Sequence, residues 1–115
     1  MTAPDPTVYL LHIRDCCQRV AECATLRDAG STPVHILLDA VCRNLEIVGE
    51  ASRKIGPDFR VLHPEIPWRE MTDLRNVLIH NYEGADPDMV WGIVNREIPQ
   101  LLTAVARILD SGLMR

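Results

Sequence analysis

Four side chains suited to phosphate chemistry fall within one stretch of eight residues: Arg75, Asn76, His80 and Tyr82. An arginine guanidinium is permanently charged and binds a phosphate through two parallel hydrogen bonds. A histidine takes up or releases a proton near neutral pH, and an amide or a phenol can orient a hydroxyl group. Short motifs also match by chance, so these residue types indicate a phosphate site without establishing one.

The segment that carries these motif residues is predicted to be an amphipathic helix that begins near Pro67. Its apolar stripe consists of Trp68, Met71, Leu74 and Leu78. On a regular helix, Arg75 and Tyr82 lie only about 20° apart, whereas Arg75 and His80 lie about 140° apart. Either the helix distorts or ends near His80, or a second subunit completes the site.

A polar residue followed by proline marks the start of three further predicted helices. These pairs are Asp5-Pro6, Thr32-Pro33 and Asp86-Pro87. The first of these helices should end at Gly30 in a left-handed conformation, and the second should run to about Ile55.

Two proline-containing regions should interrupt the helices. Residues 56–67 are predicted to form a connector with one helical turn around Asp58–Leu62. Pro99 lacks an N–H group and clashes with the preceding turn, so we expect it to break or kink the last helical region. No stretch alternates like a strand, and the prediction is an all-α, antiparallel bundle of four to five helices in a single domain spanning 1–115.

Composition restricts the partners that the protein can recruit through charge alone. The chain has 115 residues, of which 47% are hydrophobic and 4% aromatic, and its net charge is −4. Residues 43–82 carry six basic and six acidic residues, while both flanking segments are acidic. A nonspecific nucleic-acid binder is usually basic, so any site for a polyanion must be local and built from a few arginines.

The cysteines and the apolar segments bear on the compartment. Cys16, Cys17, Cys23 and Cys42 form no C-x-x-C pair and show no zinc-ligand spacing. They are interpreted as small buried residues in a reducing cytosol. Neither a membrane-spanning segment nor a signal peptide is recognisable. We therefore expect a cytoplasmic protein with no membrane association, no metal and no cofactor.

The stretch from Arg75 to Tyr82 reads R-N-x-x-x-H-x-Y and resembles the R-x4-H-x-Y signature of the HepT-like branch of the HEPN superfamily. Further segments resemble that family in order and spacing, namely 40–51, 63–68, 86–91 and Ile98-Pro99. The resemblance extends over nearly the whole chain, from about residue 8 to residue 110.

The resemblance implies a HEPN-like fold and a metal-independent endoribonuclease, the toxin of a type VII-like toxin–antitoxin pair. Arg75 and His80 would be catalytic, and Asn76 and Tyr82 would position the RNA or its phosphate. The antitoxin would be an MntA-like minimal nucleotidyltransferase that attaches AMP to Tyr82. The partners expected are therefore RNA, this nucleotidyltransferase and a second copy of the chain in a homodimer.

Two interpretations of the second predicted helix remain open. Its acidic residues Glu46 and Glu50 could form a solvated charged face, with pairs such as Glu50–Arg53. The resemblance instead places this helix beside the active site and the partner subunit. Two of the histidines outside the motif, His12 and His63, are interpreted as surface, packing or structural residues.

Two other functions also fit the motif residues. The first is a noncatalytic helical module that binds a nucleotide or a partner at the same helix end. The second is a purely structural dimerisation domain, in which Arg75 and Tyr82 make interface hydrogen bonds.

Overall fold

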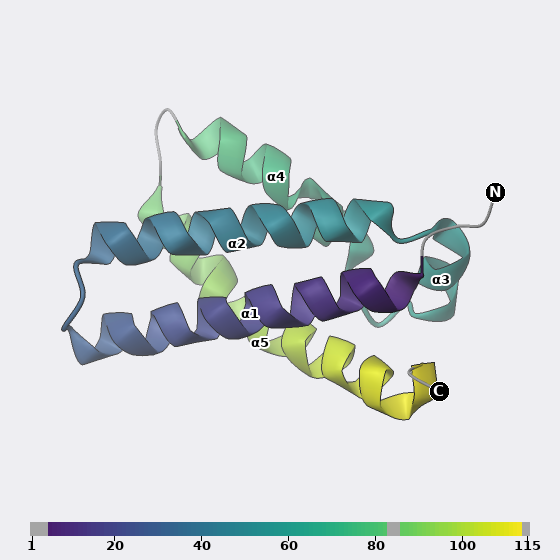
Figure 1. The fold of residues 1–115 in the computed structure, drawn as a ribbon. Coiled ribbons are helices and arrows are strands. Elements are labelled where there is room, and N and C mark those ends of the chain that lie inside the picture. The colour runs from purple at the N-terminus through teal and green to yellow at the C-terminus, as the bar shows by residue number, and fades with distance from the viewer. Residues whose placement is uncertain (1–4, 83–85, 114–115) are drawn as a thin grey trace.

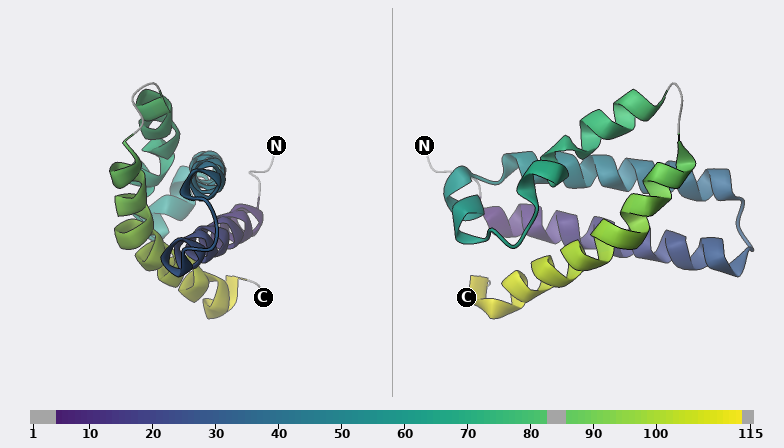
Figure 2. Two further views of the ribbon diagram at one scale, coloured as in Figure 1. Left: turned by 90° about the vertical axis from the view of Figure 1, so that its left-hand side faces the viewer. Right: turned by 180° about the vertical axis from the view of Figure 1, so that it is seen from behind.

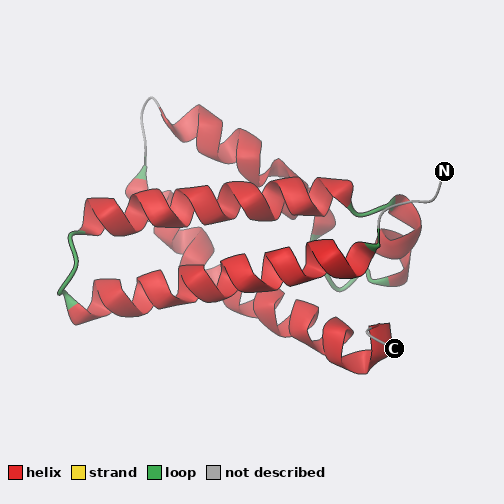
Figure 3. Cartoon of the chain, viewed as in Figure 1, coloured by secondary structure: helices red, strands yellow, loops and turns green. Residues whose placement is uncertain are grey.

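The computed structural model describes residues 5–82 and 86–113, with the side chains of 79–82 and 112–113 left undescribed. In this part of the chain the elements are α1 (Pro6–Ala29), α2 (Val34–Lys54), α3 (Pro57–Leu62), α4 (Trp68–Tyr82), α5 (Pro87–Ile108) and the short π-helix η1 (Leu109–Leu113). Within the described ranges there is no strand (Figure 3). The predicted all-α fold is confirmed.

The first two helices form a long antiparallel hairpin, and the other long helices pack against it (Figure 1). The helix α4 lies mainly against α2, whereas α5 crosses the hairpin and packs mainly on α1. The end-on view shows α4 and α5 on the same side of the α1–α2 pair (Figure 2). The motif residues are therefore carried by a helix that has α2 as its main support.

The helix boundaries are set by local signals, most of them as predicted. The Asp5 carboxylate accepts a hydrogen bond from Thr7 N at 2.9 Å, and the Asp86 carboxylate accepts one from Asp88 N at 3.1 Å. Gly30 ends α1 with φ 73°, the left-handed conformation that glycine adopts without steric cost. The single turn predicted in the connector is α3.

The structure corrects the prediction for Thr32-Pro33 and one part of the prediction for Pro99. Thr32 is not the N-cap of α2, because Pro33 has the extended ψ of 133° and occupies the cap position itself, without a side-chain hydrogen bond. Of the two outcomes expected at Pro99, a break does not occur, since α5 is continuous through it, whereas a kink stays a prediction. A helical proline removes one backbone hydrogen bond, and the neighbouring Ile98 and Leu101 are almost fully buried. Their packing offsets the lost bond.

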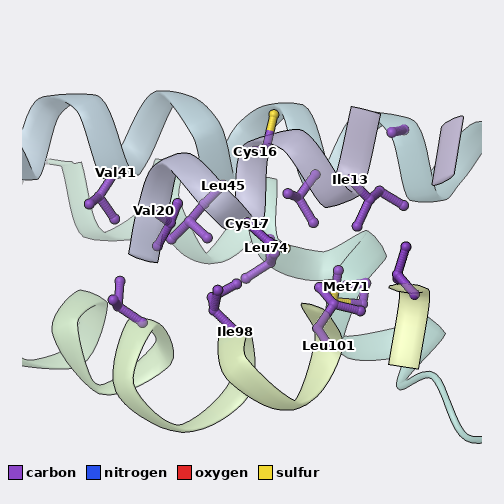
Figure 4. Packing of buried hydrophobic residues seen from close by; sticks show 14 of the residues in the cluster. Ile13, Cys16, Cys17, Val20, Val41, Leu45, Met71, Leu74, Ile98 and Leu101 are labelled. Atoms are coloured by element: carbon purple, nitrogen blue, oxygen red, sulfur yellow. The ribbon is translucent and has the colours of Figure 1, made fainter. Parts of the chain in front are cut away.

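The core is aliphatic, as the composition indicated. Side chains from α1, α2, α4 and α5 point into a shared interior, where Leu74 and Ile98 lie among the labelled residues of Figure 4. Cys16, Cys17 and Cys23 are buried as predicted, whereas Cys42 is half-buried. Burial raises the pKa of the Cys17 thiol to about 12. None of the helices in the described ranges combines the length and apolar character needed to cross a membrane.

Candidate active site

The helix α4 is fixed by its predicted apolar stripe. Trp68, Met71, Leu74 and Leu78 are all buried. The Trp68 indole also donates a hydrogen bond to the His63 carbonyl at 2.9 Å, and the His63 ring packs on Phe59 with centroids 4.5 Å apart. His63 is thus a structural residue, as the sequence suggested, and it anchors the start of α4.

The motif residues fall on two faces of α4. The backbone is α-helical through Tyr82, so the helix neither ends nor loses its helical form near His80. On such a helix, position 80 lies about 40° from Asn76 and about 140° from Arg75, while position 82 lies near Arg75. The side chains of His80 and Tyr82 lie outside the described residues, and the helical backbone alone defines the face on which each position lies.

Arg75 is exposed and lines a groove of about 430 Å³ formed with residues of α1 and α2. Its Nη1 lies 3.5 Å from Oε1 of Glu50 on α2. The alternative Glu50–Arg53 pair does not form between these two described side chains, because Arg53 Nε donates to the Thr72 carbonyl at 3.1 Å. The placement of α2 beside the motif is confirmed, and its placement at a partner subunit stays a prediction.

The Glu50–Arg75 pair orients the guanidinium without occupying it. Both side chains are about half exposed, at 46% and 51%, so the pair contributes at most about 1 kcal/mol. An arginine has five N–H donors, and the pair uses one of them. The remaining donors can bind a phosphate in the groove, where two parallel hydrogen bonds would compete well with one long contact.

The same groove contains residues that sequence reasoning missed. His12 on α1 is exposed and lines the groove together with Arg75. The neighbouring Tyr9 ring lies 6.3 Å from the His12 ring, and Lys54 Nζ lies 6.0 Å from the Tyr9 centroid. The spacing of Tyr9 and His12 puts them on one face of α1, but no signal in the sequence shows that this face adjoins Arg75.

Asn76 is exposed and belongs to a different groove, on the α3 side of α4. Its Nδ2 donates to the Asp73 carboxylate at 3.2 Å, one turn earlier on the same helix. The structure therefore brings Arg75 to one groove and Asn76 to another within one chain. In the described residues no group of three or more His, Cys, Asp and Glu side chains is placed to hold a metal ion.

Gly49 allows α2 to approach α4 at the motif. A Cβ atom built at this position would lie 3.4 Å from Arg75 N and 3.4 Å from the Met71 carbonyl oxygen. Both neighbours are backbone atoms, which cannot rotate away as a side chain can. Glycine inside a helix costs about 0.5–1 kcal/mol relative to alanine. A Cβ at 3.4 Å is in ordinary van der Waals contact, so the spacing of the two helices has room for alanine but not for a larger side chain.

We predict that Gly49→Leu destabilises the protein by roughly 1–3 kcal/mol, because its side chain must push α4 away from α2. Chemical denaturation of the purified proteins measures this difference. Gly49→Ala is the matched control, since its Cβ makes ordinary contact and its helix propensity is higher; it should change stability by less than about 1 kcal/mol. Equal stability of Gly49→Leu and wild type would contradict the close-packed interface.

The sequence profile of the family described as "Ribonuclease HepT-like" matches residues 13–108. The chain belongs to the HepT-like ribonuclease family. The match covers all of α4 and most of the α1–α2 hairpin that supports it. The resemblance of the R-N-x-x-x-H-x-Y stretch is thus accompanied by similarity over most of the helical framework.

Relatives of the HepT-like chain differ in how much of their length they share with it. It is 56% identical over 62 residues to "Probable ribonuclease HepT" of Thermococcus cleftensis, which covers 54% of this chain and 56% of that protein. The chain is also 36% identical over 108 residues to "Putative RNase TTE0752" of Caldanaerobacter subterraneus subsp. tengcongensis. This match covers 91% of the chain and 95% of that protein. The first match thus spans little more than half of its relative. No solved structure matches the chain significantly.

Proposed function

We propose that this protein is a metal-independent endoribonuclease that acts in the cytoplasm as the toxin of a type VII-like toxin–antitoxin pair. The observation that carries the proposal is the exposed Arg75, held by Glu50 at 3.5 Å in an open groove on a HepT-like helix. A guanidinium in this position has free donors for a phosphodiester. The names of the relatives support the choice of RNA as substrate.

The proposed chemistry requires no external nucleophile, because RNA supplies its own 2′-hydroxyl. His80 removes the proton from this hydroxyl, whose oxygen attacks the adjacent phosphorus while the bond to the 5′-oxygen breaks. The departing 5′-oxygen takes up a proton from water, and His80 returns its own proton to the solvent. Arg75 stabilises the charge that develops on the phosphate oxygens. Asn76 and Tyr82 position the phosphate and the neighbouring nucleotide. The products are a 2′,3′-cyclic phosphate and a 5′-hydroxyl.

The proposal is tested by incubating the purified protein with RNA in the presence of EDTA. We expect cleavage to continue at an unchanged rate, since the nucleophile, the acid–base group and the charge stabiliser all come from RNA and protein. Analysis of the fragment ends should reveal 2′,3′-cyclic phosphates. Loss of cleavage in EDTA with recovery in magnesium or manganese would contradict the mechanism.

A homodimer resolves the geometric problem that α4 presents. Arg75 and position 80 lie about 140° apart on a regular helix, so one copy directs them to different faces. Two α4 helices facing each other across a two-fold axis would bring Arg75 of one copy to His80 of the other. We propose that the active site is shared in this way between two subunits.

Mixing two inactive variants tests the shared site. Arg75→Ala and His80→Ala homodimers should each be inactive, whereas refolding them together should restore about a quarter of wild-type activity, because half of the dimers are mixed and each has one intact site. Size-exclusion chromatography with light scattering reports the dimer. A fully active monomer, or mixed dimers without activity, would refute the shared site.

A further inference from the structure

The groove beside Asn76 is the larger of the two grooves next to the motif, with a volume of about 580 Å³. Three helices each contribute one arginine to its lining: Arg53 from α2, Arg60 from α3 and Arg69 from α4. These residues lie on three consecutive helices, and the turn of the chain through α3 gathers them on one side of α4. The proposed cleavage chemistry gives no role to these three arginines.

Two of these arginines are held by neutral acceptors. Arg53 Nε donates to the Thr72 carbonyl at 3.1 Å. Arg60 Nη2 donates to the Ser52 carbonyl at 2.8 Å and its Nε donates to the Ile55 carbonyl at 3.0 Å, so that it caps the C-terminus of α2. Carbonyl oxygens fix the guanidinium groups in place but leave their full positive charge available.

The arginines of this groove differ from several others in the chain, because they have no carboxylate partner within the described residues. Among the described residues, the ion-paired arginines are Arg14, Arg27, Arg43 and Arg75. None of the three groove arginines is in an ion pair within the described part of the chain, and the Arg69 side chain has no hydrogen-bond partner there. Three arginines and the carboxylates of Glu70 and Asp73 leave the lining at 3 − 2 = +1, in a chain of net charge −4.

The arginine groove is continuous with the motif along one face of α4. Arg69, Asp73 and Asn76 line it and follow one another at intervals of four and three residues. Position 80 is four residues further on and lies on the same face of the regular helix. A strand that follows this face therefore runs from the arginines to the position of the proposed acid–base residue.

We propose that the arginine groove binds the backbone phosphates of the RNA strand on one side of the cleaved bond. This inference rests on the proposed function and extends it to the path of the substrate. None of the described residues that line the groove is aromatic, so its lining offers no ring on which a base could stack. Contacts from guanidinium groups to phosphates position a strand without reading its sequence. The groove thus supplies affinity and register rather than base specificity.

Arg69 is the best position for a test, since no hydrogen bond or ion pair of its side chain holds the described fold together. Arg69→Ala should weaken binding of a single-stranded RNA roughly five- to tenfold and reduce the slope of log affinity against log salt by about 0.7. Arg69→Glu should weaken binding further. In cleavage assays the KM should rise while kcat stays unchanged. A contact remote from the reacting atoms is made equally in the enzyme–substrate complex and in the transition state, so its loss weakens binding alone.

Arg19→Ala is the matched control, because it removes the same charge from an exposed position on α1, which does not line this groove. Binding is measured by fluorescence anisotropy with an oligonucleotide that carries 2′-O-methyl groups and cannot be cleaved. Arg69 variants that bind and cleave like Arg19→Ala overturn the inference, while cleavage by the wild type still upholds the proposed function. A wild type that binds through Arg69 but never cleaves RNA overturns the proposed function and leaves the phosphate groove supported.

Discussion

Replacing His80 with alanine should reduce RNA cleavage by roughly 10²–10⁴-fold, the usual contribution of a positioned acid–base group. Without the imidazole, no side chain of the motif can accept the 2′-hydroxyl proton near neutral pH, and Arg75 alone can only bind the phosphate. Production of the wild-type protein in a bacterial host should stop growth, and His80→Ala should relieve the arrest. Growth curves and a cleavage assay with purified protein measure the two effects.

His35→Ala is the matched control for this experiment. His35 is exposed on the first turn of α2 and lines neither of the two grooves beside the motif. The control removes the same side chain and should leave toxicity and cleavage unchanged. A stably folded His80→Ala protein that is as toxic as the wild type would remove His80 from the mechanism.

Coexpression with the cognate nucleotidyltransferase should raise the mass of the protein by one or more AMP units on Tyr82 and abolish RNA cleavage. Position 82 lies about 20° from Arg75 around α4. A phosphate attached there would compete with RNA for the guanidinium, which the half-exposed Glu50 holds only weakly. The adenosine would also fill space that the substrate needs. Intact-mass spectrometry and the cleavage assay measure both results.

Tyr82→Phe should prevent the mass increase, because phenylalanine has no hydroxyl to modify. The chain has two tyrosines, so Tyr9→Phe is the matched control and should still be modified. A reading frame beside the gene with the G-S-x10–12-D-x-D pattern of nucleotidyltransferases would identify the enzyme to use. Protein that is bound to this enzyme, unmodified and equally inactive would show that occlusion, rather than modification, silences the toxin.

Features that depend on neighbours within one helical turn could be predicted from the sequence. The caps at Asp5 and Asp86, the left-handed Gly30 and the buried stripe of α4 all follow from single residues and their neighbours up to four positions away. The positions of Arg75 and His80 around α4 follow from the helical repeat in the same way. The motif and its implied chemistry could therefore be recognised before any fold was known.

Only the tertiary structure decided which groups meet across helices. By helical spacing alone, Glu50 could reach Arg53. The close approach of α2 and α4 at Gly49 instead places Arg75 Nη1 3.5 Å from the Glu50 carboxylate. Pro99 should disrupt a helix on local grounds, yet packing of its neighbours on the core keeps α5 continuous.

The two grooves beside the motif have the same origin. Their residues come from three helices each, and no local rule relates α1 or α3 to the faces of α4. Such contacts depend on how whole helices pack, because the free energy of burying their apolar stripes outweighs the preferences of single residues. The sequence by itself thus determined the helices and the chemical groups, and packing determined which of those groups share a groove.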